Sequence, residues 1–223
     1  MSTMRAMRRL STEPVPDHLL ERLVQAAVYG PSGAHAQEYD YLVVTDRQVI
    51  ATLAPLWTRC VDAYLGSIGR IVPASMDEPS YELVREEIEY QRDHFADTPA
   101  LVIPCYRAPK ISSDLDGLRG MVTQLGTAGL GRLAARGGRM STLAEAASVY
   151  PGVQNLLLTA RSIGLGAHLT LWHLMLEREW KTALGIPSGI HTFAVIPVGW
   201  PLDDFGPIHR HRPLAEVLHR DRW

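Results

Sequence analysis

The sequence predicts a single α+β domain. The chain has 223 residues, of which 46% are hydrophobic and 21% charged, so it can bury a sizeable core. Segments with the apolar spacing of helices alternate with short segments typical of buried strands, and no internal repeat or linker interrupts them. No apolar run approaches the roughly 20 residues that a membrane-spanning helix needs.

The composition of the sequence limits the expected cellular location and the expected classes of binding partner. The basic residues 1–10 are not followed by the apolar segment of a signal peptide, and Cys60 and Cys105 have no CxxC spacing. We therefore expect a reducing, cytoplasmic location and no membrane partner. The net charge of −2 argues against a general nucleic-acid-binding function.

Charge is unevenly distributed along the chain. Residues 1–10 and 207–223 are basic, whereas residues 77–97 are strongly acidic, and arginine far outnumbers lysine. The planar guanidinium group suits phosphate or carboxylate better than a lysine ammonium does. The basic ends are therefore candidate anion-binding segments, and the alternative is solvated charge on loose termini.

The first half of the chain is expected to hold three helices and two strands. Asp17 can cap a helix whose apolar residues recur at helical spacing until Gly30 and Pro31 end it. The other expected elements are a strand over 39–45, a short helix over 46–53, a helix over 80–95 and a buried strand over 100–106.

Residues 108–140 are rich in Gly, Ser and Arg and show little apolar periodicity, which favours a mobile lid or surface insertion. The GTAGLG string at 126–131 lacks the Lys-Ser/Thr pair of a phosphate-binding loop. Thr142 and Glu145 have the spacing of a capping box, so a helix is expected from there to Ile163.

That helix carries three consecutive leucines, residues 156–158, which span about 200° of its circumference. A helix apolar so far round is buried on more than one side, either within the domain or against a second subunit. Gly164 ends it. A helix over 174–184, terminated by Gly185, and a strand over 191–198 follow, and the tail is basic.

The common catalytic signatures are absent from the sequence. There is no GxSxG motif and no HExxH motif, and His168 and His173 do not have a standard ligand spacing, so no metal site is expected. Gly164 and Gly166 are too few to form a dinucleotide-binding fingerprint. No catalytic side chain is predicted.

Five segments, in this order, together resemble the nitroreductase family of flavin enzymes: TMRAMRRL, PVPDHLLERLVQAAVYGPSGAHAQEYDYLVVTD, SVYPGVQNLLLTARSIGLGAHLT, VGWP and RHRPLAEVLHRDRW. The resemblance covers residues 3–54, 98–106 and 142–223. It implies one domain over 1–223 with a central, mostly antiparallel sheet flanked by helices, in an intertwined homodimer that binds FMN at the subunit interface. Segments of about 55–97 and 107–141 would be variable lids.

The resemblance also implies where the FMN phosphate would bind. Arg5 and Arg8 match arginines of the family's Arg-Arg-Ser-x-Arg clamp, with Ala6 in place of the serine and Met4 in place of the first arginine. Arg9 could compensate for the missing charge. In the tail, Arg210 and His211 precede Pro213, and His211 occupies the position where the family usually has arginine.

The PSGAHAQEY segment resembles the family's loop along the ribityl chain and the ring of the flavin. The implied cofactor contacts are Ser32, Gly33, His35 and Gln37, and the backbone of Ala34 would meet the substrate, as in the iodotyrosine deiodinase branch. That branch needs a Glu-Tyr-Lys lid triad. Glu86 and Tyr90 have the spacing of its first two members but come too late in the chain, and no lysine precedes Lys110, which argues against deiodination.

Leu169, Thr170 and Leu171 align with the segment on the other side of the flavin ring. Gln154 and Asn155 lie on the predicted buried helix, and a buried amide pair needs partners, which could be the flavin or a neighbouring helix. The terminal Trp223 is expected to be buried against the partner subunit, with a disordered tail as the alternative.

The function that follows is an FMN-dependent oxidoreductase. It would pass hydride from NAD(P)H through the flavin to a nitro, quinone or enone acceptor, with the cofactor rather than a side chain supplying the chemistry. The alternative is a flavin- or deazaflavin-binding protein without reductase turnover, which carries or sequesters its cofactor.

Overall fold

A computed structural model describes residues 1–107, 115–207 and 212–222. At its centre is an antiparallel sheet in the order β1-β2-β5-β3, with β4 also paired to β2. The strands are β1 (Tyr39–Val44), β2 (Ala100–Arg107), β3 (Gly166–Ala167), β4 (Ile190–Thr192) and β5 (Ile196–Gly199). This confirms the α+β class and the antiparallel sheet.

The single strand expected over 191–198 is instead two strands. β4 pairs with residues 105–107 of β2, and β5 pairs with residues 100–102. Pro104 lies in the gap; it has no N–H to donate, although its carbonyl accepts a hydrogen bond from Phe193 N at 2.9 Å. The ladder is therefore interrupted where proline removes a donor.

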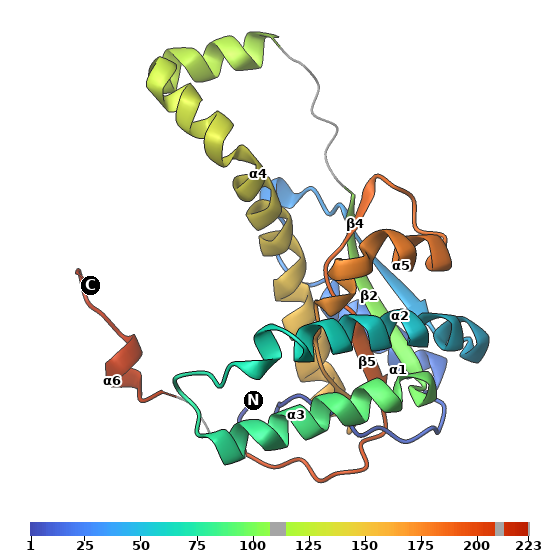
Figure 1. Cartoon of the computed structure of the whole chain (residues 1–223). Helices are drawn as coiled ribbons and strands as arrows, with labels where there is room; N and C mark the ends of the chain where they lie inside the picture. Colours follow the sequence, from blue (N-terminus) through green and yellow to red (C-terminus); the bar gives the residue numbers. More distant parts are fainter. Residues whose placement is uncertain (108–114, 208–211, 223) are drawn as a thin grey trace.

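Two helical layers cover the sheet (Figure 1). On one face lie α1 (Asp17–Ala27) and the lower part of α4 (Leu115–Ser162), which share an apolar core with β2 and β5. On the other face lie α2 (Arg47–Leu65), α3 (Glu78–Asp93) and α5 (Glu177–Leu184), packed around the fully buried Trp57, Phe95 and Trp180. A short α6 (Leu214–Val217) lies in the tail. No helix in the described part of the chain is long and apolar enough to cross a membrane.

Three expectations about helix ends need correction. Asp17 is the first residue of α1 rather than its cap, because Pro16 holds the N-cap position and no side chain caps that end. The helix expected over 46–53 extends to Leu65, since buried residues continue at helical spacing. The helix expected from 174 begins with a 3-10 turn over Trp172–Leu176, and α5 starts only at Glu177.

The largest correction concerns α4. The expected start at Thr142 is wrong, because the hydroxyl of Thr142 donates to Gly138 O at 3.1 Å inside a helix that is already formed. Residues 115–141 of the predicted lid are helical, with a kink at Gly126 (φ 66°), and so is most of the GTAGLG string. This part projects from the body (Figure 1), which explains why its sequence lacks an apolar stripe.

The leucine triplet of α4 was expected to be buried on more than one side, but within the single chain only Leu156 is fully buried. Leu156 is fully buried against the sheet, whereas Leu157 and Leu158 are half-buried in the single chain. Gly164 (φ 85°) and Gly185 (φ 65°) adopt the left-handed conformation after α4 and α5, which confirms both as helix terminators.

Candidate functional site

Two neighbouring cavities share one arginine. The first, called the Arg5 cavity, has a volume of about 290 Å³ and is lined by Arg5, Ala6, Met7, Arg8, Leu83, Val84, Glu87 and Asp203. The second, called the His168 cavity, has a volume of about 210 Å³ and is lined by Arg8, Gln91 and residues 168–172. Arg8 lines both, so the predicted N-terminal arginines and the predicted 169–171 segment come together at this residue.

The N-terminal segment is attached to the sheet by its backbone. Met7 N donates to Ala167 O at 3.2 Å, and Met7 O accepts from His168 Nδ1 at 3.1 Å. Further along, Ser11 N donates to Trp200 O at 2.8 Å. Because Met7 is buried between these contacts, its neighbour Arg8 is directed into the space between α3 and residues 168–172.

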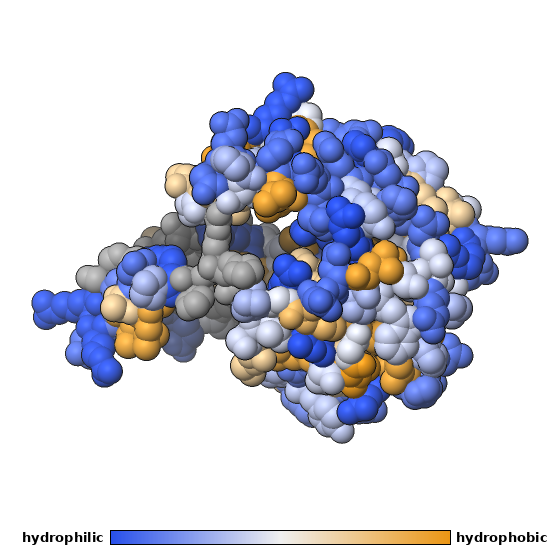
Figure 2. All heavy atoms as spheres, turned by 90° about the horizontal axis from the view of Figure 1, so that it is seen from below, coloured by the Kyte–Doolittle hydropathy of each residue, from blue (hydrophilic) through white to orange (hydrophobic). Residues whose placement is uncertain are grey.

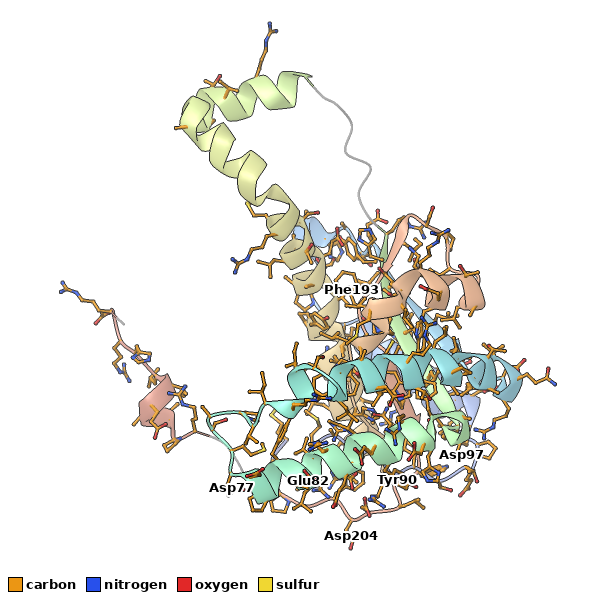
Figure 3. All side chains as sticks on the ribbon, in the orientation of Figure 1. Asp77, Glu82, Tyr90, Asp97, Phe193 and Asp204 are labelled. Atoms are coloured by element: carbon orange, nitrogen blue, oxygen red, sulfur yellow. The ribbon has the colours of Figure 1, made fainter. Side chains whose placement is uncertain are left out.

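The three N-terminal arginines have different partners. Arg9 donates to Glu87 Oε1 at 2.8 Å and lies 4.2 Å above the ring of Tyr90, so it ties the N-terminal segment to α3, where Tyr90 is labelled in Figure 3. The hydrogen bond to Glu87 raises the pKa of Arg9. Arg5 donates to the carbonyl of Asp204 at 3.2 Å and is otherwise exposed.

Arg8 is the arginine without such partners. Among the described residues, no hydrogen bond or ion pair engages its guanidinium group, although the group is half-buried. Burial lowers its pKa, and the nearby charge of Glu87 only partly opposes that effect. A half-buried cation of this kind is suited to an anionic or electron-rich ligand.

Two further polar side chains in the His168 cavity, those of Gln91 and His168, were not among the cofactor-binding residues expected from the sequence. Gln91, on α3, is 4% exposed and His168 is 3% exposed; Gln91 Nε2 and His168 Nε2 are buried without a hydrogen-bond partner among the described residues. The only sequence signal for Gln91 was its position three residues after Ile88, on the apolar face of the helix. Buried polar atoms are nearly always paired in native structures, with ordered water or with a ligand where no protein group serves, so these two atoms make the lining of the His168 cavity a candidate binding surface.

The side chains of residues 169–171 alternate between exposed and buried. Thr170 is buried, and its backbone exchanges two hydrogen bonds with Val195, at 3.1 and 2.9 Å. Leu169 and Leu171 consequently face outward and are 36% and 41% exposed. The segment thus offers a fixed backbone with apolar side chains on its open side.

The loop after α1 is strained. Ala34, His35 and Gln37 all have positive φ angles, of 51°, 56° and 52°. The loop is held by Ser148 of α4, whose hydroxyl accepts from Gly33 N at 3.0 Å, and by Ser32 Oγ, which accepts from Gln37 N at 3.1 Å. Clustered strain of this kind is characteristic of functional segments.

This loop does not reach the two cavities within one chain. The described lining of the Arg5 and His168 cavities contains none of residues 32–37. Gln154 is exposed rather than part of a buried amide pair, and Asn155 is half-buried. Arg210, His211 and Trp223 lie outside the described residues.

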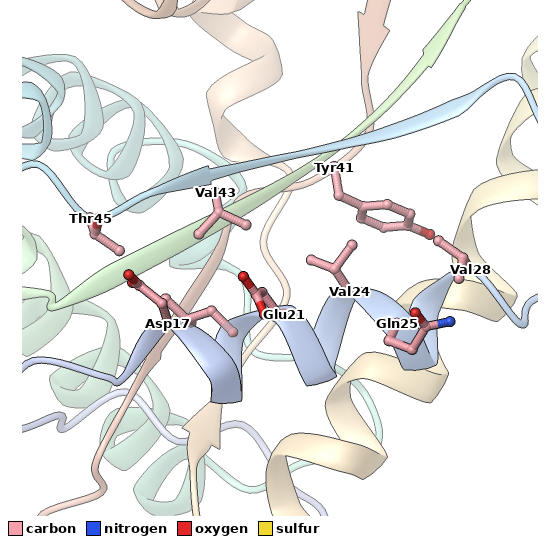
Figure 4. Close-up of a pocket in the computed structure, with 9 residues that line it drawn as sticks. Asp17, Glu21, Val24, Gln25, Val28, Tyr41, Val43 and Thr45 are labelled. Carbon is pink, nitrogen blue, oxygen red and sulfur yellow. The ribbon is translucent and has the colours of Figure 1, made fainter.

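A larger cavity of about 430 Å³ lies between α1 and β1 and contains none of the predicted site residues (Figure 4). Tyr41 lines it, and burial raises the pKa of this tyrosine to about 12. In the described part of the chain no cluster of His, Cys, Asp and Glu residues could hold a metal ion.

Comparisons with solved structures agree with this architecture. Oxidised iodotyrosine deiodinase bound to FMN and 3-iodo-L-tyrosine superimposes with a TM-score of 0.65 at 18% identity, over 98% of this chain and 95% of that one. The NADPH:FMN oxidoreductase of Vibrio harveyi complexed with NAD⁺ gives 0.64 at 16% identity, over 100% of this chain and 75% of that one. The fold is therefore nitroreductase-like.

The sequence comparison identifies the family to which the chain belongs. Residues 2–200 match the nitroreductase family, and the chain belongs to that family. A relative from Methanothermobacter thermautotrophicus with the provisional name NADH dehydrogenase/NAD(P)H nitroreductase is 22% identical over 225 residues, which cover 100% of this chain and 85% of the relative.

Proposed function

We propose that this protein is an FMN-dependent oxidoreductase that transfers hydride from NAD(P)H to a nitro, quinone or enone acceptor. Family membership supports the class of activity. The single observation that carries the proposal is the His168 cavity, which is lined by Arg8, by a fixed backbone segment, and by Gln91 and His168, each with a buried polar atom that has no partner among the described residues.

The donor and acceptor groups of this site fit FMN. Arg5, which lines the Arg5 cavity and is exposed, offers charge for a phosphate, and Arg8, at the junction with the His168 cavity, offers charge beside the ring. Leu169, Leu171 and Trp172 offer apolar surface for a flat ring. Arg9 is already paired with Glu87, so its role is to hold α3 against the N-terminal segment.

When bound, FMN supplies the chemistry by accepting and giving up hydride. The residues of this chain bind and orient it. Arg8 places a positive charge beside the ring site, where it favours a ligand that gains electron density. The backbone of residues 169–171 is held by β5, and Leu169 and Leu171 exclude water from that face.

We further propose that a second copy of the chain completes the site. The strained loop over residues 32–37 lies on α4, away from the cavities of its own chain. The same helix has apolar side chains that the described residues leave largely uncovered, since Met140 and Leu143 are 55% and 56% exposed. A homodimer that packs along α4 would cover these side chains and bring the loop to the partner's cavities.

Anaerobic spectroscopy tests the proposal. We expect the purified protein to show the visible absorption of oxidised flavin, NADH or NADPH to bleach it, and a nitroaromatic, quinone or enone to restore it. Absorption that neither nucleotide bleaches would support the binding-protein alternative instead. Absence of flavin, together with failure to bind added FMN, would refute both. Testing 3-iodo-L-tyrosine as an acceptor in the same assay examines deiodination, which we expect to be absent.

A further inference from the structure

The His168 cavity has a definite pattern of hydrogen-bond donors and acceptors. His168 Nδ1 faces the carbonyl oxygen of Met7 at 3.1 Å, and a carbonyl oxygen can only accept. The proton of the imidazole is therefore on Nδ1. In the neutral ring, Nε2 then carries a lone pair and acts as an acceptor.

The neutral form of His168 is strongly favoured. Burial lowers its pKa to about 3, and the charge of Arg8 lowers it further in the same direction. At neutral pH, Nε2 is consequently an unprotonated, buried acceptor to which no donor among the described residues is hydrogen-bonded.

The other two polar groups of the cavity are donors. The amide nitrogen of Gln91 is buried without a partner, and the guanidinium group of Arg8 is not engaged by any hydrogen bond among the described residues. The cavity thus combines one acceptor with two donors, and Leu169, Leu171 and Trp172 provide its apolar lining.

This pattern does not suit a carboxylate or a cationic amine as the ligand. An ionised carboxylate has no proton to donate to His168 Nε2, and a cationic amine would be repelled by Arg8. The complementary group is a flat imide, in which an N–H lies between two carbonyl oxygens. The pyrimidine end of a flavin ring is an imide of this kind.

We propose that the His168 cavity binds the imide edge of the flavin, with His168 Nε2 accepting the imide N–H and with Arg8 and Gln91 donating to the flanking carbonyls. This inference rests on the proposed FMN function and adds two cofactor-positioning residues to it. It also makes α3, within the family's variable region, a determinant of which ring the site accepts.

The decisive experiment compares two ligands on the unmodified protein. The affinities of the apoprotein for FMN and for FMN methylated on the imide nitrogen are measured by fluorescence titration. The phosphate and ribityl contacts are common to both and cancel. We expect the methylated ligand to bind about 10- to 100-fold more weakly, because it leaves the buried acceptor of His168 unpaired.

Variants test which residue causes the difference in affinity between the two ligands. In His168→Leu, we expect the difference between the two ligands to fall to about threefold or less, a coupling that a merely structural role would not produce. Gln91→Leu should weaken binding of both ligands up to about tenfold. Gln48→Leu, the same change at an exposed position of α2, should leave both affinities unchanged.

The possible results are distinguishable. If FMN and its methylated form bind equally well, His168 does not accept the imide N–H and the inference is wrong, while the FMN function stands. If neither binds, the inference and the proposed function both fail. The two-ligand comparison remains decisive even if His168→Leu does not fold.

Discussion

Neighbouring arginines at the N-terminus have different partners and therefore differ in how much charge they can offer to a ligand. Arg9 is neutralised by Glu87 at 2.8 Å, with Asp203 4.0 Å away, whereas Arg8 is half-buried and without a hydrogen bond or ion pair among the described residues. Only an arginine without such a partner can contribute its full charge to a ligand, so Arg8 is the N-terminal arginine on which flavin binding is expected to depend most.

Replacing Arg5 and Arg8 together by alanine should weaken FMN binding at least a hundredfold. Each substitution removes a charge-assisted contact worth about 1.5–3 kcal/mol, and about 1.4 kcal/mol corresponds to a factor of ten. Flavin retained through gel filtration and the dissociation constant for added FMN are the measurements. Arg22→Ala, an exposed arginine of α1, is the control. A double variant that keeps its flavin contradicts the assignment.

Two buried histidines should make stability depend on pH. Burial lowers the pKa of His168 to about 3 and that of His173 to about 4. Between these values and the unfolded pKa of about 6.5, only the unfolded chain takes up protons at these positions, so stability is present above pH 6.5 and is lost as the pH falls.

From pH 7 to pH 5, each of these histidines should cost about 2 kcal/mol of unfolding free energy, which urea denaturation can measure. In the control variant His173→Phe, the group that must charge on unfolding is removed, so about half of the loss should disappear. Equal stability of the unmodified protein at the two pH values would show that these histidines are not held neutral.

Among the elements, α1 and α4 approach each other unusually closely. A β-carbon on Gly152 of α4 would lie 2.5 Å from both Ala27 O and Tyr41 Oη, and one on Gly30 would lie 2.5 Å from Gly152 N. The contact between the two helices therefore depends on glycine at both positions. It also fixes where the strained loop after α1 begins.

Gly152→Ala should destabilise the protein by about 1–3 kcal/mol, because the added methyl group forces α1 away from α4. Gly138→Ala in the same helix is the matched control, since a β-carbon there meets nothing within 4 Å. The control should be stabilised by up to about 1 kcal/mol through helix propensity. Thermal unfolding distinguishes the two, and equal melting temperatures would contradict the packing argument.

At the scale of the whole molecule, a single chain leaves apolar surface uncovered. Besides α4, the tail extends away from the body (Figures 1 and 2), with Leu214 70% exposed and Val217 and Leu218 about half exposed. An obligate homodimer would bury more than roughly 2,000 Å² in total. Both segments are therefore candidates for its interface.

Deleting residues 218–223 should weaken the dimer and flavin retention together. The deletion removes an exposed apolar residue of the tail and the terminal tryptophan, and truncation of a buried tryptophan typically costs about 3 kcal/mol or more. Light scattering at micromolar concentration gives the oligomeric state, and flavin absorbance gives retention. If the truncated protein keeps its dimer, its flavin and its melting temperature, the tail has no such role.

Local signals in the sequence were sufficient to predict many of the helices and strands. Apolar periodicity and glycine stops predicted α1, α3, β1, β2 and the helix ends at Gly164 and Gly185, because these features depend on a few adjacent residues. The motifs were also sufficient for the family, since their order along the chain is itself specific.

Other features depend on contacts between distant residues. The helical structure of residues 115–141, kinked at Gly126, has no apolar stripe to reveal it, and the split between β4 and β5 depends on Pro104 in another strand. Arg9 pairs with Glu87 only when α3 packs against the N-terminal segment. The same packing brings Arg8 together with Gln91 and His168, whose Nε2 atoms have no partner in the described part of the chain. Hydrogen-bond partners are a property of three-dimensional proximity, so the tertiary structure alone decided which polar groups of this protein remain available to a ligand.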